Sequence, residues 1–324
     1  MISIFFRCKR EATNSIETVF GSIDGLLKIH NVVSLPYSGA SFAKIIKNIV
    51  YAWRHRGTVN HITGDVHYIA LALGRNTILT VHDVQSALRI SNSLKRLYIK
   101  LLWFYLPALI VKKITVISDF TRKELEHVIP FAKNKITVIH NPFSPSIQYS
   151  ARDTTSGLPI ILHLGTKENK NLERVAQAAS GLRCKLVVLG KMTEKQRLLM
   201  EEYKICYEDY YDLPYSKVAK LYKECDIVSF PSLYEGFGMP VLEANAAGRP
   251  VLAGDIAVLH EVAGEAAYFV NPTDVDAIRN GLTELLSNRD LRANLVAKGK
   301  ENVKRFLPET IAEKYNQLYE SLLK

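Results

Sequence analysis

The stretch over residues 227–261, IVSFPSLYEGFGMPVLEANAAGRPVLAGDIAVLHE, constrains the fold more than any other part of the chain. It begins with a short apolar run, Ile227–Phe230, that predicts a buried strand. Gly236 and Gly238 then predict a loop, and a helix is expected over about Met239–Ala247. Another apolar run after this helix predicts the next strand. Strand, glycine loop, helix and strand in this order are typical of an α/β fold.

The glycine loop and the start of the predicted helix together form a site for an anion. Backbone N–H groups at a helix N-terminus and the helix dipole both favour phosphate, and glycine lets the backbone approach a ligand closely. Glu235 before the loop and Glu243 inside the helix would repel phosphate, but a carboxylate accepts hydrogen bonds from a vicinal diol. A diphosphate between two hydroxylated rings fits this arrangement, and that is the shape of a nucleotide sugar.

The wording PSLYEGFGMPVLEANAAGRPV resembles the E-x7-E signature of retaining GT-B glycosyltransferases of family four. The resemblance implies two Rossmann-like parallel-sheet domains facing each other across a cleft. It implies that Glu235 faces the donor sugar, that Glu243 holds the ribose, and that the helix start takes the diphosphate. The donor-binding residues that it implies are Lys170, Glu235, Gly236, Phe237, Gly238, Met239 and Glu243. An ordinary strand–helix turn with surface glutamates is the alternative.

The loop GTKENKN, which follows a strand predicted over residues 159–164, resembles the first donor-side loop of the family. In the family an Arg and a Lys of this loop neutralise the diphosphate. Lys170 matches the Lys, whereas Thr166 stands where the Arg is often found, and Lys167 is an open candidate to replace it. Lys170 also opposes the dipole of the helix expected after it, which favours a ligand-binding role over a merely solvated side chain.

Two segments of the first half resemble family wording as well. His82 follows a strand predicted over residues 76–81, and in an open α/β sheet that end faces the ligand crevice. In the family a histidine so placed contacts the donor sugar near the reacting carbon, so His82 and Glu235 are the implied catalytic residues. Asp83 is expected to orient the imidazole or to cap the next turn. Asp65, in HITGDVHYIAL, is an acceptor-side candidate with Asp83, but it also suits the N-cap of the following helix, which is the preferred interpretation.

The length of 324 residues and the hydrophobic content of 48% predict two domains. We expect an N-terminal, acceptor-binding Rossmann-like domain over 1–142 and a linker rich in Pro, Ser and Thr over 143–157. A C-terminal, nucleotide-sugar-binding Rossmann-like domain is expected over 158–307, and a last helix over 308–324 that crosses back to the first domain. The four cysteines are widely spaced with no C-x-x-C pair, which argues against zinc and disulfides and predicts a reducing compartment.

Positive charge is concentrated in the first half of the chain. Residues 1–150 carry 19 Lys and Arg against 8 Asp and Glu, whereas residues 151–324 carry 23 against 24. A one-sided positive field indicates an anionic partner, and no nucleic-acid-binding module is recognisable. We therefore expect the first half to face an anionic membrane or a lipid-diphosphate acceptor, the alternative being a basic surface that serves solubility.

The most apolar region is LKRLYIKLLWFYLPALIVKK, over residues 94–113. Its uninterrupted apolar part, residues 101–111, is too short to suggest a transmembrane span. A helix packed inside the domain is the first interpretation. A partly exposed face that touches a membrane, with basic residues at both ends, is the second. The N-terminus does not resemble a secretory signal, so we expect a cytoplasmic protein, with peripheral contact at the inner face of the membrane as a hypothesis.

The resemblance implies transfer of a hexose-type sugar from a nucleotide-diphosphate donor to a glycan or lipid-linked acceptor, with retention of anomeric configuration, in polysaccharide or glycolipid assembly. Fixed positive charge and helix N–H groups should stabilise the leaving diphosphate. No metal or cofactor is expected, because no cluster of metal ligands is recognisable in the sequence. The alternatives are a catalytically silent nucleotide-sugar-binding subunit and a GT-B nucleotide-sugar epimerase. A dinucleotide-dependent oxidoreductase is disfavoured, because Gly236-x-Gly238 lacks a third glycine.

Overall fold

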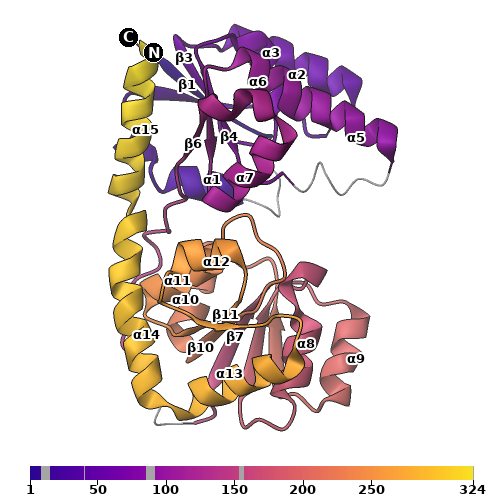
Figure 1. The fold of residues 1–324 in the computed structure, drawn as a ribbon, viewed down its shortest axis with the longest axis vertical. Helices are drawn as coiled ribbons and strands as arrows, with labels where there is room; N and C mark the ends of the chain where they lie inside the picture. The colour runs from indigo at the N-terminus through magenta and orange to yellow at the C-terminus, as the bar shows by residue number, and fades with distance from the viewer. Residues whose placement is uncertain (9–14, 40, 85–91, 153–156, 324) are drawn as a thin grey trace. The chain divides into compact units, whose positions relative to one another are not determined.

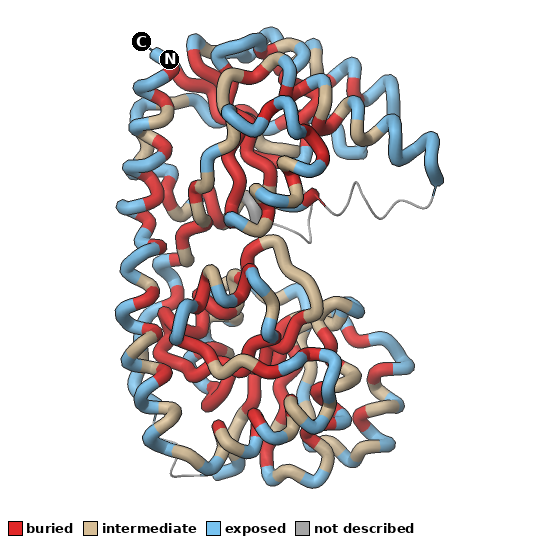
Figure 2. Tube along the Cα trace, in the orientation of Figure 1, coloured by how far each residue is buried: buried red, intermediate tan, exposed pale blue. Residues whose placement is uncertain are grey.

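The computed structural model describes residues 1–8, 15–39, 41–84, 92–152 and 157–323, which form two compact units (Figure 1). Unit 1 consists of Met1–Pro142 and Pro308–Lys324, and unit 2 of Phe143–Leu307. Each unit contains a sheet of six parallel strands flanked by helices. Figure 2 shows that the buried residues are concentrated in these sheets. Two Rossmann-like domains of this kind make up the GT-B fold, so the predicted fold class is confirmed.

The sheet of unit 1 has the strand order β2-β1-β3-β4-β5-β6. Every residue of β3 and β4 is buried, as expected for central parallel strands that are covered by helices on both faces. From β1 the chain adds β2 on one side and then β3 on the other, so the strand order reverses between β1 and β3. The strands are β1 Ile2–Phe6, β2 His30–Ser34, β3 Val59–Ile62, β4 Thr77–Val81, β5 Lys113–Val116 and β6 Ile136–Val138.

The apolar segment over residues 94–113 forms three consecutive helical pieces in unit 1: α5, a π-helix η3 (Lys100–Tyr105) and α6. Trp103 and Phe104 are buried, but Leu94 and Leu109 are exposed. The expectation of a helix packed inside the domain is therefore correct for one face only. The helices of unit 1 are α1 Ser15–Gly21, α2 Phe42–Arg54, α3 Ala70–Leu73, α5 Ser93–Ile99, α6 Leu106–Ile110, α7 Asp119–Val128 and α15 Pro308–Leu323.

Helix α7 begins with Ser118 as its N-cap, and the Ser118 hydroxyl accepts from the Thr121 N–H at 3.0 Å. The predicted cap at Asp65 is wrong, because Asp65 does not cap the following helix. The chain instead enters a 3₁₀ turn, η2 (His67–Ile69), whose N-cap position is held by Val66 and has no side-chain hydrogen bond.

The last helix, α15, packs into unit 1 through its aromatic side chains. The hydroxyl of Tyr319 lies 2.7 Å from Nδ1 of His61 in β3, and the ring of Tyr315 lies 5.2 Å from the same imidazole. The other imidazole nitrogen lies 2.7 Å from the Thr80 hydroxyl. Burial, aided by the nearby His82, lowers the pKa of His61 to about 3. A neutral histidine therefore joins two strands of the sheet to α15.

The sheet of unit 2 has the strand order β12-β11-β10-β7-β8-β9. The chain builds β8 and β9 outward from β7 and then returns to place β10 on the other side, so the strand order reverses between β7 and β10. In a doubly wound sheet, the crevice at such a reversal is where ligands bind. The strands are β7 Ile160–Leu164, β8 Lys185–Leu189, β9 Tyr207–Tyr210, β10 Ile227–Phe230, β11 Val251–Gly254 and β12 Tyr268–Val270.

The helix that follows β10, α11, is buried along most of its length, and its Ala and Gly neighbours allow close packing. A Cβ at Gly299 of α14 would lie 3.2 Å from Nδ2 of Asn245 in α11. The helices of unit 2 are α8 Leu172–Ala179, α9 Glu194–Glu202, α10 Tyr215–Glu224, α11 Met239–Ala247, α12 Ala257–Ala263, α13 Val275–Ser287 and α14 Arg289–Asn302.

Candidate functional site

The predicted donor residues of unit 2 come from the loops that follow β7 and β10, the two strands between which the strand order reverses. These strands pair directly and in parallel, with Ser229 opposite His163, so their carboxyl ends lie at the same edge. There Nζ of Lys170 lies 2.6 Å from Oε1 of Glu235 and 4.7 Å from the centre of the Phe230 ring. The structure thus brings two of the predicted site residues into direct contact.

The loop after β7 is shaped to hold Lys170 in this position. Gly165 has φ +93°, and a Cβ on it would lie 2.6 Å from Cγ of Lys170, so only glycine leaves room for the lysine stem. Asn171 adopts the left-handed conformation with φ 69° and is buried. Its amide donates to the carbonyls of Pro231 and Pro272, at 3.0 and 2.6 Å. Asparagine tolerates this conformation better than most residues, and here it joins the loop after β7 to the loop after β10.

A second asparagine joins the same two loops. The side-chain amide of Asn169 donates to the Tyr234 carbonyl at 2.9 Å, and the N–H of Leu233 donates to the Asn169 carbonyl at 2.8 Å. We did not predict a role for Asn169 or Asn171 from the sequence. The only signal was the run ENKN itself, because their partners lie about sixty residues or more away. These bonds fix the separation of Lys170 and Glu235.

The ion pair suits a site that binds both phosphate and hydroxyl groups. The side chains of Lys170 and Glu235 are 21% and 12% exposed, so the pair is shielded but reachable. An ammonium has three donors and a carboxylate about four acceptor positions. The two groups can therefore bind each other and still contact a diphosphate and the hydroxyls of a sugar.

The start of α11 has the backbone geometry expected of the predicted anion site. Gly238 is its N-cap, with φ +109°, and a Cβ there would lie 2.5 Å from Cδ2 of Leu259. Gly236 and Met239 are partly exposed in the same loop. The side chain of Phe237 is buried edge-on against Phe306, with ring centroids 5.9 Å apart, so this residue can offer a ligand only its backbone.

Glu243 lies one turn further along α11 and is oriented by two tyrosines of α10. The hydroxyl of Tyr215 donates to Oε1 at 2.6 Å and that of Tyr222 to Oε2 at 2.7 Å. Burial raises the pKa of Glu243, an effect that the two phenolic hydrogen bonds oppose. Burial and the adjacent carboxylate also raise the pKa of both tyrosines, so they remain donors. We did not predict the tyrosines, although their spacing of seven places them on one helix face.

A buried histidine lies beneath the Lys170 loop. His163 of β7 is fully buried next to Ser229 of β10. Burial, together with the positive charge of Lys170, lowers the pKa of His163 to about 4, so the imidazole is neutral at pH 7. His163 therefore adds no positive charge beneath the Lys170 loop at pH 7.

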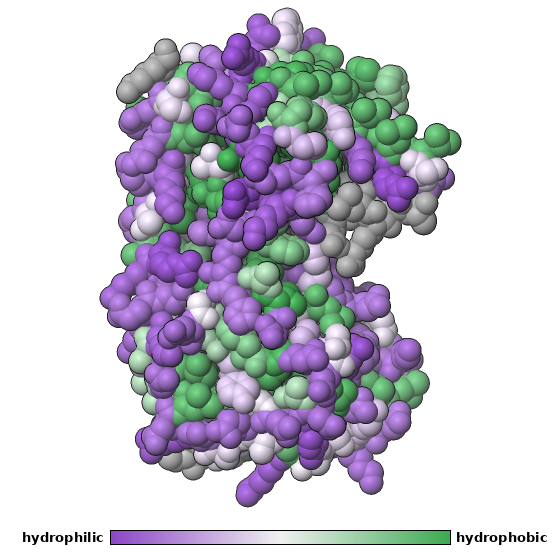
Figure 3. Space-filling view, viewed as in Figure 1, coloured by the Kyte–Doolittle hydropathy of each residue, from purple (hydrophilic) through white to green (hydrophobic). Residues whose placement is uncertain are grey.

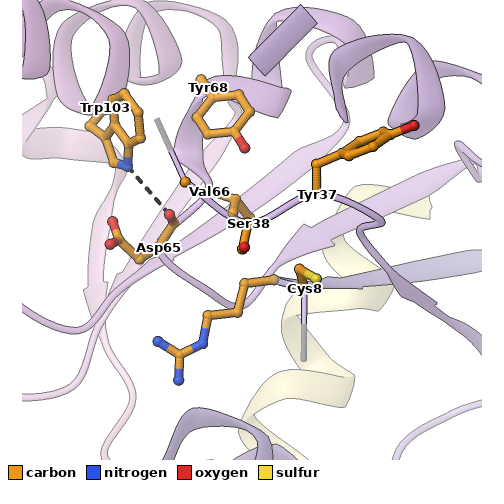
Figure 4. Close-up of a pocket in the computed structure, with 9 residues that line it drawn as sticks. Cys8, Tyr37, Ser38, Asp65, Val66, Tyr68 and Trp103 are labelled. Atoms are coloured by element: carbon orange, nitrogen blue, oxygen red, sulfur yellow. Dashed lines mark hydrogen bonds between the residues drawn. The ribbon is translucent and has the colours of Figure 1, made fainter. Parts of the chain in front are cut away.

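Unit 1 has a cavity of about 100 Å³ beside the reversal between β1 and β3 (Figure 4). In this view Trp103, Tyr68 and Tyr37 lie along one side of the space, with Asp65 and Cys8 across from them. The indole N–H of Trp103 donates to the Asp65 carbonyl at 3.4 Å, which leaves the exposed carboxylate of Asp65 at the cavity. The lining residues are Arg7, Cys8, Tyr37, Ser38, Gly39, Asp65, Val66, Tyr68 and Trp103.

His82 follows β4 at the same sheet edge. Its Nε2 lies 2.8 Å from the Thr63 carbonyl oxygen, which can only accept, so Nε2 carries the proton and Nδ1 is the acceptor nitrogen. Burial lowers the pKa of His82 to about 4, although the hydrogen bond to Thr63 opposes the shift. The neighbouring Asp83 is exposed. Unit 1 therefore presents a neutral histidine on the loop next to the one that bears Asp65.

Comparison with known proteins agrees with the observed fold and with the sequence motif of the site. Residues 151–302 match the family model Glycosyl transferases group 1, and residues 29–146 match Glycosyltransferase Family 4. O-antigen chain mannosyltransferase B of Escherichia coli is 30% identical over 223 residues, which cover 60% of this chain and 57% of that protein. O-antigen chain mannosyltransferase RfbU of Salmonella typhimurium is 25% identical over 215 residues, covering 63% and 59%. The chain thus spans less than two thirds of the length of these two relatives.

Solved structures resemble the chain over nearly all of its length. WaaG, a glycosyltransferase involved in lipopolysaccharide biosynthesis, has a TM-score of 0.74 at 13% identity and covers 98% of this chain, with 99% of WaaG covered. Anabaena Alr3699/HepE in complex with UDP-glucose has a TM-score of 0.78 at 14% identity, with 99% of each chain covered. The chain therefore has the GT-B fold, and each half of it resembles a glycosyltransferase family. At these identities the structural likeness concerns the fold alone.

The chain departs from the family motif at the expected Arg. Thr166 occupies that position, and its hydroxyl donates to the Lys191 carbonyl at 2.7 Å. Lys167 is exposed at the N-cap of the 3₁₀ turn η5, Glu168–Lys170. A role for Lys167 at the diphosphate therefore stays a prediction.

We find no metal-binding cluster in the described part of the chain. None of its groups of three or more His, Cys, Asp or Glu side chains is placed to hold a metal ion.

Proposed function

We propose that this protein is a glycosyltransferase that moves a hexose-type sugar from a nucleoside-diphosphate donor, bound by unit 2, to a glycan or lipid-linked acceptor, with retention of anomeric configuration. The observation that carries the proposal is the Lys170–Glu235 pair at the strand reversal of unit 2, in the loop that leads to the N-terminus of α11. The names of two relatives, both O-antigen mannosyltransferases, support a hexose and a glycan acceptor. The UDP-glucose complex of a structural neighbour supports a nucleotide sugar as donor.

In this proposal the diphosphate lies against the N-terminus of α11 and the ammonium of Lys170. Negative charge develops on the diphosphate as its bond to the sugar breaks, so fixed positive charge there stabilises the transition state more than the ground state. Glu235 accepts hydrogen bonds from the hydroxyls of the sugar. The ion pair lets one small site bind the anion and orient the ring.

The ribose of the donor is assigned to Glu243. Each of its carboxylate oxygens already accepts one phenolic hydrogen bond, from Tyr215 or Tyr222. A carboxylate oxygen has two acceptor positions, so both oxygens keep the capacity to bind the 2′- and 3′-hydroxyls. Because the tyrosines orient the carboxylate before a ligand arrives, little ordering is left for the binding step.

The acceptor is assigned to unit 1. The catalytic role that the resemblance implies for His82 is a contact with the donor sugar, for which its imidazole is neutral and offers Nδ1 as an acceptor. The cavity bearing Asp65 has aromatic faces and polar groups, a combination that suits a carbohydrate ring. Deprotonation of the acceptor hydroxyl falls to the departing phosphate, as the family resemblance implies. All four cysteines are free thiols, which supports action in a reducing compartment.

A donor screen tests the proposal directly. UDP-, GDP- and dTDP-sugars are added singly, and a bound donor should raise the Tm by mass action. The donor that does so is then incubated with candidate glycan and lipid-linked acceptors, and released nucleotide and the anomeric configuration of the product are measured. Binding without turnover would favour a silent subunit, and an isomerised sugar formed without acceptor would favour an epimerase. An inverted product would overturn the retaining mechanism.

A further inference from the structure

An exposed apolar stripe runs along α2 of unit 1. Phe42, Ile46, Val50 and Trp53 follow one another at spacings of four, four and three residues, which places them on one side of the helix. Phe42 is 72% exposed and Trp53 is 52% exposed. The opposite side of the helix, with Ile45, Asn48 and Ala52, is buried in the domain. The buried face already packs α2 against the domain, so the exposed apolar side chains are not needed for folding.

The α5 segment has a similar exposed surface. None of its seven residues is buried, although four are apolar or aromatic, and Leu94 is 78% exposed. Leu97 and, in the following turn, Leu101 continue the apolar surface. Figure 3 shows hydrophobic side chains gathered over the part of unit 1 where α2, α5 and α6 lie in Figure 1.

The two helices are joined through the buried layer beneath them. The amide of Asn48 in α2 donates to the Tyr68 hydroxyl at 2.8 Å. The Tyr68 ring in turn packs edge-on against Trp103, which lies in the helical segment that continues α5, with centroids 5.0 Å apart. Both exposed surfaces are therefore fixed to one rigid layer of unit 1.

The charge around these helices has one sign. The sequence has no Asp or Glu over residues 25–64 or 84–118. Lys47 and Arg54 are exposed on α2, and Lys95 and Arg96 are exposed on α5. Arg56 lies 5.2 Å from the Trp53 ring, so cations lie next to the apolar stripe itself. Exposed aromatic and leucine side chains bordered by cations are the composition of a helix that lies in a membrane interface.

We propose that α2 and α5 form a docking surface by which unit 1 binds a bilayer that contains anionic lipids. The exposed apolar side chains enter the boundary between headgroups and acyl chains, and the lysines and arginines contact the anionic headgroups. No helix of the described residues is both long and apolar enough to cross a bilayer, so this contact is made at the surface. The surface would hold the enzyme where lipid-linked acceptors are, an addition to the proposed function that does not depend on it.

The charge pattern favours a bilayer over a second copy of the chain. In a symmetric dimer the same patch meets itself, so the basic residues of one copy would face those of the other. Like charges held together at an interface are unfavourable, whereas an anionic bilayer complements them. The occupant that fits both the apolar stripe and its basic border is therefore the anionic membrane.

Flotation of the full chain with vesicles tests the surface without any sugar donor. Vesicles of phosphatidylcholine alone are compared with vesicles of phosphatidylcholine and phosphatidylglycerol. We expect binding to the anionic vesicles and much weaker binding to the neutral ones. Phe42→Ser with Trp53→Ser should lower the partition coefficient at least about tenfold, because two large apolar side chains no longer insert. Lys47→Glu with Lys95→Glu should lower the partition coefficient about fivefold or more per residue, because each change removes a cation that contacts the anionic headgroups.

Matched variants in unit 2 serve as controls. Leu198→Ser with Tyr211→Ser removes exposed apolar side chains of similar size, and Lys195→Glu reverses an exposed charge. These variants should bind vesicles like the parent chain, and unchanged Tm values show that all variants fold. Equal binding to both vesicle types, or no loss in the α2 and α5 variants, would overturn the proposal. Conversion of a dimer to a monomer by Phe42→Ser with Trp53→Ser would assign the surface to a second copy instead.

Discussion

Units 1 and 2 are built on the same kind of six-stranded parallel sheet but arrange their charge differently. Unit 2 is nearly neutral, and it pairs Lys170 with Glu235 at the reversal of its strand order. The first half of the chain has an excess of Lys and Arg, and in unit 1 many of these lie exposed on helices that lack acidic residues. A ligand of fixed shape needs oriented charge, whereas a broad anionic surface needs only charge of the right sign.

The two candidate sites also differ in how firmly hydrogen bonds hold their side chains in place before a ligand binds. In unit 2, asparagines join the two ligand loops and tyrosines orient Glu243. In unit 1 the candidate groups at the strand reversal are an exposed Asp65, a neutral His82 and a small cavity. In the proposed function, the donor is therefore recognised by groups that are ordered before it binds, and the acceptor by a more exposed surface.

The largest effect is expected from breaking the ion pair of unit 2. Lys170→Ala should lower kcat about 10²–10³-fold, because it removes the cation facing the developing charge of the diphosphate. Lys167→Ala is the matched control on the same loop and should cost less than about threefold if Lys170 carries this role alone. Steady-state rates with a saturating donor check both. Equal losses in the two variants would mean that Lys167 takes the place of the missing Arg.

A stability effect of about 2–3 kcal/mol is expected from Gly238→Ala, because it combines an unfavourable backbone conformation with a steric clash. The new Cβ would lie 2.5 Å from Leu259, at φ +109°. Gly181→Ala is the control, since φ there is +74° but the nearest atom, at 3.9 Å, is the tip of the Arg279 side chain. Urea unfolding should give about 1 kcal/mol for the control. Equal losses would show that the contact with Leu259 relaxes.

A smaller loss is expected from Tyr222→Phe, which removes one hydrogen bond to the buried Glu243. The free energy of unfolding should fall by about 1–2 kcal/mol, because a buried carboxylate loses a donor. Binding of the nucleoside diphosphate should weaken, since Glu243 is then less well oriented. Tyr211→Phe, at an exposed position of the same unit, should change neither. Calorimetric titration with the free nucleotide separates the two effects, and unchanged affinity would remove Glu243 from the ribose site.

The last expected effect is the pH dependence due to buried histidines, and it differs between the units. Burial lowers the pKa of His61 to about 3 and that of His82 to about 4 in unit 1, and that of His163 to about 4 in unit 2. Such a group stabilises the native state fully above the unfolded pKa of about 6.5. The contribution is lost as pH falls towards the folded pKa, by about 1.4 kcal/mol per pH unit for each histidine.

Unit 1 should therefore lose stability faster than unit 2 between about pH 6 and pH 4.5. His67 is also buried in unit 1, and burial lowers its pKa too. Amide hydrogen exchange, measured at several pH values and assigned to each sheet, checks the difference. His55→Asn, at an exposed position, should leave both slopes unchanged. Equal slopes in the two sheets would contradict the expected difference.

Local signals in the sequence were sufficient for the fold and for the centre of the donor loop. Helix α11 begins and ends at the predicted residues, because Gly238 and Gly248 both adopt left-handed conformations at its ends. The strand predictions held because β-branched runs in a parallel sheet are buried on both faces. The ion pair of Lys170 and Glu235 joins two loops whose resemblance to the family motifs had already marked them as donor-binding candidates. The contact between the two residues was not predicted.

Interactions that depend on tertiary contacts could not be predicted in the same way. The partners of Asn171 are Pro231 and Pro272, which are distant in the sequence. The predicted cap at Asp65 was wrong for a local reason, since a 3₁₀ turn follows it. The prediction that residues 94–113 form a helix packed inside the domain was only half correct. Hydrophobicity alone does not show which face of a helix the domain covers.

The position of α15 has a consequence for biosynthesis. Unit 1 is interrupted by the whole of unit 2, and its helix α15 carries Tyr319, whose hydroxyl lies 2.7 Å from the buried His61. During translation the first sheet therefore emerges from the ribosome long before the helix that covers His61. Until residues 308–323 have been made, that face stays open and is a natural target for a chaperone.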